Sequence, residues 1–294
     1  MKAHIRNYAT AYLFVSPLLV AVSVFLLYPI LKAAIMSFQY WYLTKPVGGN
    51  PFVGFQNYYE VIRYDYFTSS IFITIAYIVV TVIARFALGL GVAVLLNQDF
   101  RGKSLVRALV IIPWAVPEVV ACLVFILMFD HQYGIINEFL MKLHLLTSPV
   151  AFLGDSDTAL GAAMLVNVWK GFPFVAIMLL AGLQSIPKEL YEAAKVDGAS
   201  TWRQFRYVTL PMLKPVSVIV FLLLVIWTIK DFAIVYVLTG GGPSRATEIF
   251  TIFIYNTAFK NFQFGEAAAA GMLVMLVSTV FTILYFKATK GAEN

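Results

Sequence analysis

The sequence contains little charge and almost no cysteine. Only 12% of its 294 residues are Asp, Glu, Lys or Arg, whereas 61% are hydrophobic. A soluble domain of this size carries about twice that share of charge. The single cysteine, Cys122, excludes an intramolecular disulfide and a multi-cysteine metal site. The composition therefore predicts an integral membrane protein without redox chemistry.

Signals for catalysis, metal binding and nucleic-acid binding are also scarce. The three histidines, His4, His131 and His144, are too scattered to predict a metal site. The stretch TGGGP at 239–243 lacks the Gly-Lys-Ser/Thr ending of a phosphate-binding loop. No nucleophile with a matching base can be defended, and in a membrane chain the net charge of +6 mostly marks the cytoplasmic side. We therefore expect no enzyme activity, no cofactor or metal on this chain and no nucleic-acid partner.

Long apolar runs dominate the chain. A helix needs about 20 apolar residues to cross the hydrocarbon core, and six segments reach that length. The sequence therefore predicts an all-α, polytopic membrane protein that forms a single domain over residues 1–294. The six predicted spans are 12–36, 70–96, 105–129, 159–182, 216–238 and 267–286.

The distribution of Lys and Arg predicts the orientation of these spans. With both termini on the cytoplasmic side, twelve basic residues lie in cytoplasmic parts and five lie outside. Because basic residues near span ends favour the cytoplasm, we expect both termini to be cytoplasmic. The twelve are Lys2, Arg6, Arg101, Lys103, Arg107, Lys188, Lys195, Arg203, Arg206, Lys214, Lys287 and Lys290, and the five are Lys45, Arg63, Lys142, Arg245 and Lys260.

The longest cytoplasmic connection, 184–215, contains the charged stretch ELYEAAKVDGAS. Pro187 fits the first turn of a helix, and a stripe at helical spacing follows. Gly198 can end this helix in the left-handed conformation, Ser200 or Thr201 can cap a second helix through Tyr207, and Leu210–Pro211 is expected to end it. The stripe consists of Leu190, Ala193, Ala194 and Asp197. This pattern predicts a helix–turn–helix hairpin, which serves either as a docking surface or as an amphipathic hairpin lying on the bilayer.

Five charged residues lie deep within the predicted spans, more than five residues from either end, where each is costly unless it is paired or faces water. Four of them lie roughly 20 Å from the cytoplasmic ends of their helices at about 1.5 Å per residue, near Asn167 and Trp227. Such a layer suits a sugar path, because sugars stack on aromatic rings and need hydrogen-bond partners. Alternatively, the charges only pair with each other or with a neighbouring subunit and hold helices together. The candidate path residues are Glu118, Asn167, Lys170, Trp227, Lys230 and Asp231, and Arg85 is the fifth charge.

The stretch EAAKVDGASTWRQFRYVTLPMLKP resembles the cytoplasmic signature of permease subunits of ATP-binding-cassette importers. The pattern matches at Glu192, Ala193, Ala194, Gly198, Val208, Leu210 and Pro211. Four further stretches are similar to the carbohydrate-uptake branch, which includes permeases for maltose and glycerol-3-phosphate. These are FVGFQNY at 52–58, IIPWAVPEVV at 111–120, LQSIPKELYEAAKVDGA at 183–199 and LTGGGPSRATE at 238–248.

The resemblance implies a binding-protein-dependent importer of the prokaryotic cytoplasmic (inner) membrane that works by alternating access. Glu192, Ala193, Ala194, Asp197, Gly198, Leu210 and Pro211 would then form the coupling element for the ATPase. The implied partners are a second, homologous permease subunit, two cytoplasmic ATPase subunits that hold ATP and Mg, and an extracytoplasmic solute-binding protein. The alternative from the residues alone is a self-sufficient ion-coupled secondary transporter or channel.

Overall fold

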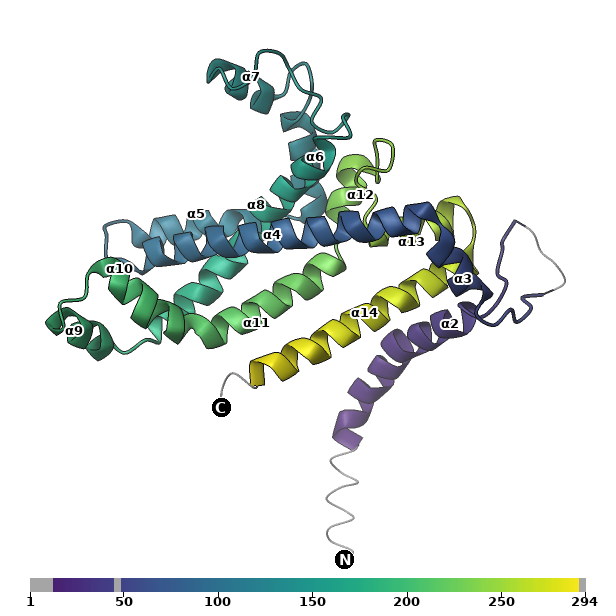
Figure 1. The fold of residues 1–294 in the computed structure, drawn as a ribbon, viewed down its shortest axis with the longest axis horizontal. Helices are drawn as coiled ribbons and strands as arrows, with labels where there is room; N and C mark the ends of the chain where they lie inside the picture. The colour runs from purple at the N-terminus through teal and green to yellow at the C-terminus, as the bar shows by residue number, and fades with distance from the viewer. Residues whose placement is uncertain (1–12, 45–48, 291–294) are drawn as a thin grey trace, which may run out of the picture. The chain divides into compact units, whose positions relative to one another are not determined.

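The computed structural model describes residues 13–44 and 49–290, and these are mostly helical (Figure 1). Within these ranges the only extended pairings are two isolated bridges, Gln39 with Phe52 and Tyr42 with Gln263. The all-α prediction is therefore confirmed. Three basic residues that were counted for the orientation, Lys2, Arg6 and Lys45, lie outside the described residues.

Backbone contacts divide the chain into two compact units. The first comprises the chain through Thr68 together with Ile254–Val277, and the second comprises Ser69–Phe253 together with the chain from Ser278. The interpretation of residues 1–294 as one domain stays a prediction.

Five helices of the described chain are long and apolar enough to cross a membrane, and a bent pair of helices raises this number to six. The predicted segments 12–36, 70–96, 159–182 and 267–286 each coincide with one of these helices to within a few residues. The five are Leu13–Met36, Asp65–Asn97, Ala159–Gln184, Thr201–Ile229 and Phe264–Lys287.

The first unit contains the Leu13–Met36 span, a short helix and the beginning of the last span. The first span includes the π-helical turn η1 (Ser23–Leu27) and α2 (Tyr28–Met36). The short helix is α3 (Gln56–Arg63). Helices α13 (Phe250–Tyr255) and η3 (Asn256–Lys260) precede α14 (Phe264–Lys290).

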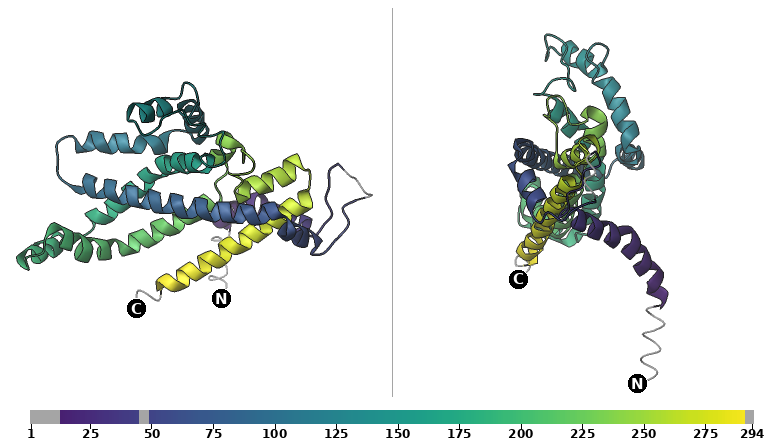
Figure 2. Two further views of the ribbon diagram at one scale, coloured as in Figure 1. Left: turned by 45° about the horizontal axis from the view of Figure 1, so that its top comes forward. Right: turned by 90° about the vertical axis from the view of Figure 1, so that its right-hand side faces the viewer.

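The second unit is built around α4 (Asp65–Asn97), α5 (Lys103–Ala115), α8 (Ala159–Gln184) and α11 (Leu210–Ile229). These helices lie side by side in both views (Figures 1 and 2). The shorter helices of this unit follow breaks in the chain or lie at its ends. They are α6 (Glu118–Met128), α7 (Ile135–Lys142), α9 (Lys188–Val196), α10 (Thr201–Gln204), the π-helical η2 (Phe205–Thr209) and α12 (Ala233–Thr239).

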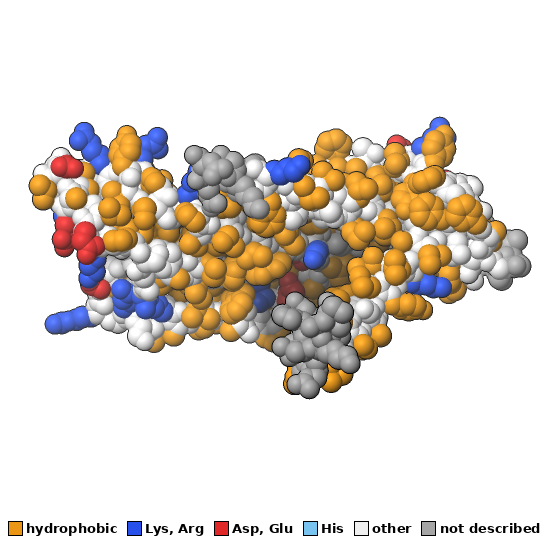
Figure 3. Space-filling model, turned by 90° about the horizontal axis from the view of Figure 1, so that it is seen from below, with side chains coloured by type: hydrophobic (Ala, Val, Ile, Leu, Met, Phe, Trp, Pro, Cys, Tyr) orange, Lys and Arg blue, Asp and Glu red, His pale blue; other side chains and the backbone are white. Residues whose placement is uncertain are grey.

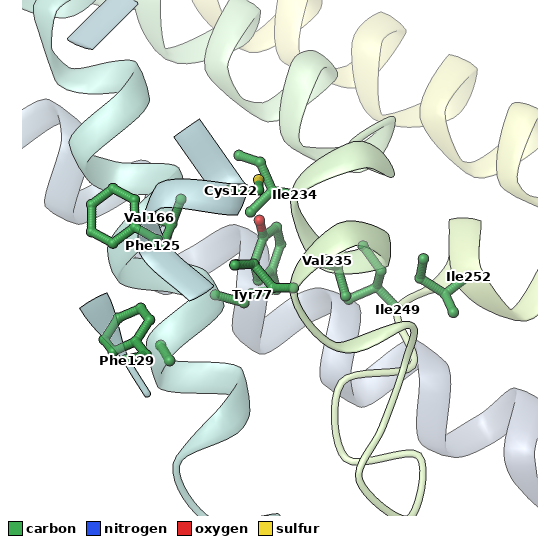
Figure 4. Packing of buried hydrophobic residues seen from close by; sticks show 12 residues of the cluster. Tyr77, Cys122, Phe125, Phe129, Val166, Ile234, Val235, Ile249 and Ile252 are labelled. Atoms are coloured by element: carbon green, nitrogen blue, oxygen red, sulfur yellow. The ribbon is translucent and has the colours of Figure 1, made fainter. Parts of the chain in front are cut away.

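Two apolar clusters hold the second unit together. The first joins α4, α6, α8 and α12 around Tyr77, and Figure 4 shows Cys122, Val166 and Ile234 gathered near its ring. The second joins α4, α8 and α11, and Val82, Leu179 and Leu213 are almost completely buried in it. The first cluster packs against the N-terminal half of α8 and the second against its C-terminal half. This packing positions the helices that carry the polar residues described below.

The third predicted span, 105–129, corresponds to a bent pair of helices. Helix α5 ends at Ala115, α6 begins at Glu118, and the two are bent by 93°. The cause is Pro117, because a proline disfavours helical backbone at the residue before it. Val116 accordingly has an extended conformation, with ψ of 132°.

The fifth predicted span, 216–238, is not one continuous helix. The helix begins at Thr201, ends at Ile229 and is followed by the separate helix α12, so that Lys230 and Asp231 lie in the break. Pro211 does not end a helix as expected. In the preceding π-helical turn, the Leu210 N–H bonds to the Phe205 carbonyl oxygen, and this wider turn relieves the clash of the proline ring with a carbonyl one turn back. Pro29 follows η1 in the same way.

The surface is largely apolar outside the ends of the helices. Figure 3 shows hydrophobic side chains over most of one face, while charged side chains gather at the end where α9 and α10 lie. Large apolar side chains such as Phe72, Leu127 and Leu276 are more than half exposed. An apolar surface of this kind is suited to lipid.

Candidate functional site

A cavity of about 440 Å³ opens in the second unit, where two helix breaks meet. One break separates α5 from α6, and the other separates α11 from α12. Non-helical backbone at membrane depth is tolerated where it lines a cavity. The lining residues are Arg85, Trp114, Glu118, Asn167, Lys170, Gly171, Phe174, Leu224, Trp227, Thr228, Lys230, Asp231, Phe232 and Ala233.

All six candidate path residues line this one cavity. Glu118 begins α6, Asn167 and Lys170 come from α8, Trp227 from the last turn of α11, and Lys230 and Asp231 from the following break. The structure thus brings together the residues that the sequence places in one layer. Their role in a path stays a prediction.

The side chain of Asp231 is held by two neutral donors. The Tyr77 hydroxyl donates to its Oδ2 at 2.6 Å, and the Asn167 Nδ2 donates to the same oxygen at 2.5 Å. The Thr251 hydroxyl donates to the backbone oxygen of Asp231 at 2.5 Å. These bonds satisfy a largely buried carboxylate without an ion pair.

Asn167 presents an unsatisfied acceptor. Only 1% of the residue is exposed, and its Oδ1 has no hydrogen-bond partner. Because Asp231 accepts from the Nδ2, the orientation of the amide is fixed, and the Oδ1 is left to face elsewhere. A buried acceptor without a partner is costly, and a ligand hydroxyl could satisfy it.

Arg85 also lines the cavity, although it was not among the candidate path residues. Its Nε donates to the Asn167 backbone oxygen at 3.0 Å, and its Nη1 lies 3.5 Å from the Thr228 hydroxyl oxygen. The residue is 7% exposed. Its position within an apolar run could have indicated this location, since charged residues in membrane spans usually face the interior of the helix bundle.

The α5–α6 break supplies a backbone acceptor. The Lys170 ammonium donates to the Trp114 carbonyl oxygen at 3.0 Å, a group whose helical partner would have been the Glu118 N–H beyond the break. In the part of the chain that the structure describes, no ion pair joins the acidic and basic groups of the cavity.

Aromatic side chains form one wall of the cavity. The ring centroids of Phe174 and Trp227 are 4.8 Å apart, and those of Trp114 and Phe174 are 6.4 Å apart. Trp227 and Trp114 remain about half exposed. Of these three aromatic residues, only Trp227 was among the candidate path residues, because spacing along separate helices does not show which aromatic rings meet.

The predicted hairpin forms at the end of the same unit. Helix α9 begins after Pro187, and Gly198 adopts a φ of +75°. The Ala199 N–H bonds to the Ala194 oxygen and the Gly198 N–H to the Lys195 oxygen, which is the Schellman arrangement of a glycine-ended helix. The Ser200 side chain accepts from the Arg203 N–H at 3.5 Å and caps the next helix.

Most of the predicted coupling residues face outward. No residue of α9 is buried, and Glu192, Ala193, Asp197 and Gly198 are exposed, as are Leu210 and Pro211, whereas Ala194 is half-buried. On the inner side, the Tyr191 hydroxyl and the Thr209 hydroxyl lie 3.0 Å apart and tie α9 to η2. The hairpin therefore presents a small-residue surface with charges around it.

These features define a helical membrane subunit with a central polar cavity and an exposed hairpin at one end. The chain matches the family model described as the binding-protein-dependent transport system inner membrane component over residues 85–289. The chain belongs to this family, and the predicted family assignment is confirmed.

Relatives extend the match to nearly the whole chain. The chain is 38% identical over 286 residues to the trehalose/maltose transport system permease protein MalF of Thermococcus litoralis, covering 97% of this chain and 95% of that protein. It is 32% identical to the sulfoquinovosyl glycerol transport system permease protein SmoG of Agrobacterium fabrum, covering 94% and 89%.

The fold is also that of a solved transporter. A chain of a bacterial alginate ABC transporter, solved in complex with an alginate pentasaccharide-bound periplasmic protein, matches with a TM-score of 0.83 at 20% identity. The match covers 97% of this chain and 95% of that chain. At this identity the likeness shows the fold alone.

Proposed function

We propose that the chain is a transmembrane subunit of an ATP-driven importer for a sugar, or for a related polyol or glycerophosphate. The observation that carries the proposal is the single cavity that combines an aromatic wall with buried polar groups. The names of the relatives, which refer to trehalose, maltose and a sulfoquinovosyl glycerol, support a carbohydrate as solute.

The chemistry of the cavity suits a polyhydroxylated solute. The exposed faces of Trp114 and Trp227 offer stacking surfaces for the apolar face of a sugar ring. The unpartnered Asn167 Oδ1 accepts a hydroxyl hydrogen, while Glu118 and Lys230 supply an acceptor and a donor at the rim.

The hairpin is proposed as the docking element for a cytoplasmic ATPase subunit. Exposed Ala193 allows close approach, Glu192 offers a charge to a basic residue of a groove, and the Gly198 turn sets the angle between α9 and α10. ATP and Mg would be bound by two such partner subunits, and a second, homologous permease subunit and a solute-binding protein would complete the importer. The membrane is the prokaryotic cytoplasmic membrane, with both termini in the cytoplasm.

The decisive experiment identifies the solute and then perturbs the cavity. The complex is purified with its binding protein, and the bound solute is identified by mass spectrometry. ATP-driven uptake of that solute is then measured in proteoliposomes for Trp227→Ala and Asp231→Asn. Loss of one stacking face is expected to raise the apparent KM about 3- to 10-fold. Ile219→Ala, an exposed position on the same helix, is the matched control.

The outcomes separate the competing interpretations. If Trp227→Ala and Asp231→Asn both prevent assembly, the cavity charges are structural, and if both transport like the parent chain, the cavity is not the path. Uptake that follows an ion gradient without ATP would identify a self-sufficient transporter instead.

A further inference from the structure

Helix α3 presents three distinct sides. Asn57 and Val61 are buried. Phe55, Tyr59 and Ile62, which follow i, i+4, i+7 spacing, are 73%, 60% and 55% exposed. The third side is polar and consists of Gln56, Glu60 and Arg63, with the Gln56 amide donating to the Glu60 carboxylate at 2.7 Å. An exposed helix with an apolar stripe beside a polar stripe is suited to a boundary between an apolar medium and water.

The buried side of α3 is tied to the end of the first span. The Asn57 Nδ2 donates to the backbone oxygens of Ser37 at 2.8 Å and Gln39 at 2.9 Å. Ser37 directly follows α2, which ends at Met36. A Cβ at Gly265, in the first turn of α14, would lie 2.4 Å from the same Gln39 oxygen. Helix α3 is therefore at the level where α2 ends and α14 begins.

Three further contacts are consistent with this level being at a membrane surface. The Lys32 ammonium lies 5.1 Å from the centroid of the Trp41 ring, as expected where a lysine reaches from an apolar span toward the interface. The Phe264 N–H, which starts α14, donates to the Trp41 backbone oxygen at 3.0 Å. Tyr40 and Tyr42 flank Trp41 in the sequence, and their two rings stack on each other with centroids 5.0 Å apart. Tryptophan and tyrosine gather at this depth of a bilayer.

Hydrogen bonds of Tyr42 join this segment to the start of α14. Its hydroxyl donates to the Glu266 carboxylate at 3.2 Å and accepts from the Gln263 amide. Burial raises the pKa of Tyr42 to about 12, so the hydroxyl keeps its proton and remains a donor through neutral and moderately alkaline pH. The segment that carries α3 thus stays fixed to the start of α14.

We propose that α3 is an interfacial anchor that lies along the membrane surface. The stripe of Phe55, Tyr59 and Ile62 inserts at the boundary between headgroups and acyl chains, and Gln56, Glu60 and Arg63 face water and headgroups. The occupant of the apolar stripe is lipid rather than a partner protein, because α3 is bonded to the end of one span and lies one residue before another, α4 at Asp65. This inference does not depend on the transported solute.

Collision accessibility of spin labels tests the proposal on the full chain. Single cysteines are placed at the neighbouring pairs Phe55 and Gln56, and Ile62 and Arg63, in a Cys122→Ala background. The labelled proteins are reconstituted in nanodiscs of phosphatidylethanolamine and phosphatidylglycerol. We expect the ratio of oxygen to nickel-chelate accessibility to be several-fold higher at 55 and 62 than at 56 and 63, because oxygen concentrates in lipid.

Each other outcome overturns the anchor. Equal, water-like accessibility at both members of each pair would show that α3 stands away from the bilayer. Labels at 55 and 62 that neither reagent reaches would show that protein covers the stripe. The two pairs are independent, so that a failure of one variant to fold leaves the other pair to decide.

Discussion

The Arg85 side chain crosses α8 directly over Gly171. A Cβ atom on residue 171 would lie 2.4 Å from the Arg85 Nε, and real Cβ atoms do not approach other atoms so closely. The same Nε bonds to the Asn167 backbone oxygen at 3.0 Å. Glycine at 171 is therefore what allows the buried guanidinium to reach its partner on α8.

Gly171→Ala is expected to destabilise the chain. The new methyl group displaces Arg85 and breaks its bond to Asn167, and a charged group that loses a buried hydrogen bond costs about 1.5–3 kcal/mol. Gly161→Ala on the same helix is the matched control, because a Cβ there meets nothing within 4 Å. Thermal unfolding in detergent should show a lower melting temperature for the first variant only. Equal melting temperatures would show that Arg85 moves aside freely.

Tyr77→Phe is expected to lower the stability of the protein and to change solute binding while it keeps the shape of the apolar core. The change removes the hydroxyl that donates to Asp231 at 2.6 Å and leaves a buried carboxylate with one donor fewer, at a cost of about 1–3 kcal/mol. The melting temperature should fall and the apparent solute affinity should change. Tyr133→Phe, at a position that is 89% exposed, controls for loss of a hydroxyl. An unchanged Tyr77→Phe variant would argue against a role of this bond.

Substitutions at Gly198 separate backbone strain from steric contact. A Cβ at this position meets nothing within 4 Å, but φ is +75°, a conformation that asparagine tolerates and valine does not. Gly198→Val should reach the membrane yet bind the ATPase subunit weakly and transport little, whereas Gly198→Asn should stay close to the parent chain. Co-purification of the ATPase and solute uptake measure this. Normal coupling in Gly198→Val would exclude the hairpin as the coupling element.

The orientation predicted from basic residues can be tested by labelling. Cysteines at Ser200, beside the hairpin, and at Ser244, in the loop after α12, are introduced in a Cys122→Ala background. An impermeant thiol reagent applied to intact cells should label only the cysteine at 244, because residue 200 is expected to face the cytoplasm. Labelling of both positions by this reagent would contradict the proposed topology.

The span positions were predictable because hydropathy reports which residues prefer lipid. Hydropathy alone does not show the breaks, because an apolar count cannot distinguish a continuous helix from two short ones. Pro117 gave a usable signal for the break before Glu118. The break at Lys230 has no proline, and at Pro211 the π-helical turn keeps the helix continuous. The rule that a proline ends a helix therefore failed at Pro211, because the π-helical turn before it accommodates the ring.

The cavity was only partly predictable for a different reason. Charges in apolar runs are conspicuous, so Glu118, Lys170 and Asp231 could be grouped by depth. Tyr77 and Trp114 could not, because aromatic residues are abundant in this chain and only the packing of separate helices selects those that meet. The turn at Gly198 was predictable because its geometry depends on neighbouring residues alone.

The uninterrupted helix from Thr201 to Ile229 connects the hairpin at its N-terminal end with the cavity at its C-terminal end. Its 29 residues span about 43 Å at 1.5 Å per residue, so a tilt of about 5° moves the far end by roughly 4 Å. Ser200 caps the helix at one end, and Trp227 is in the last turn at the other. If α9 has the proposed coupling role, a tilt imposed on this helix at the hairpin would reposition Trp227 at the cavity, and no relay of side chains would be needed between them.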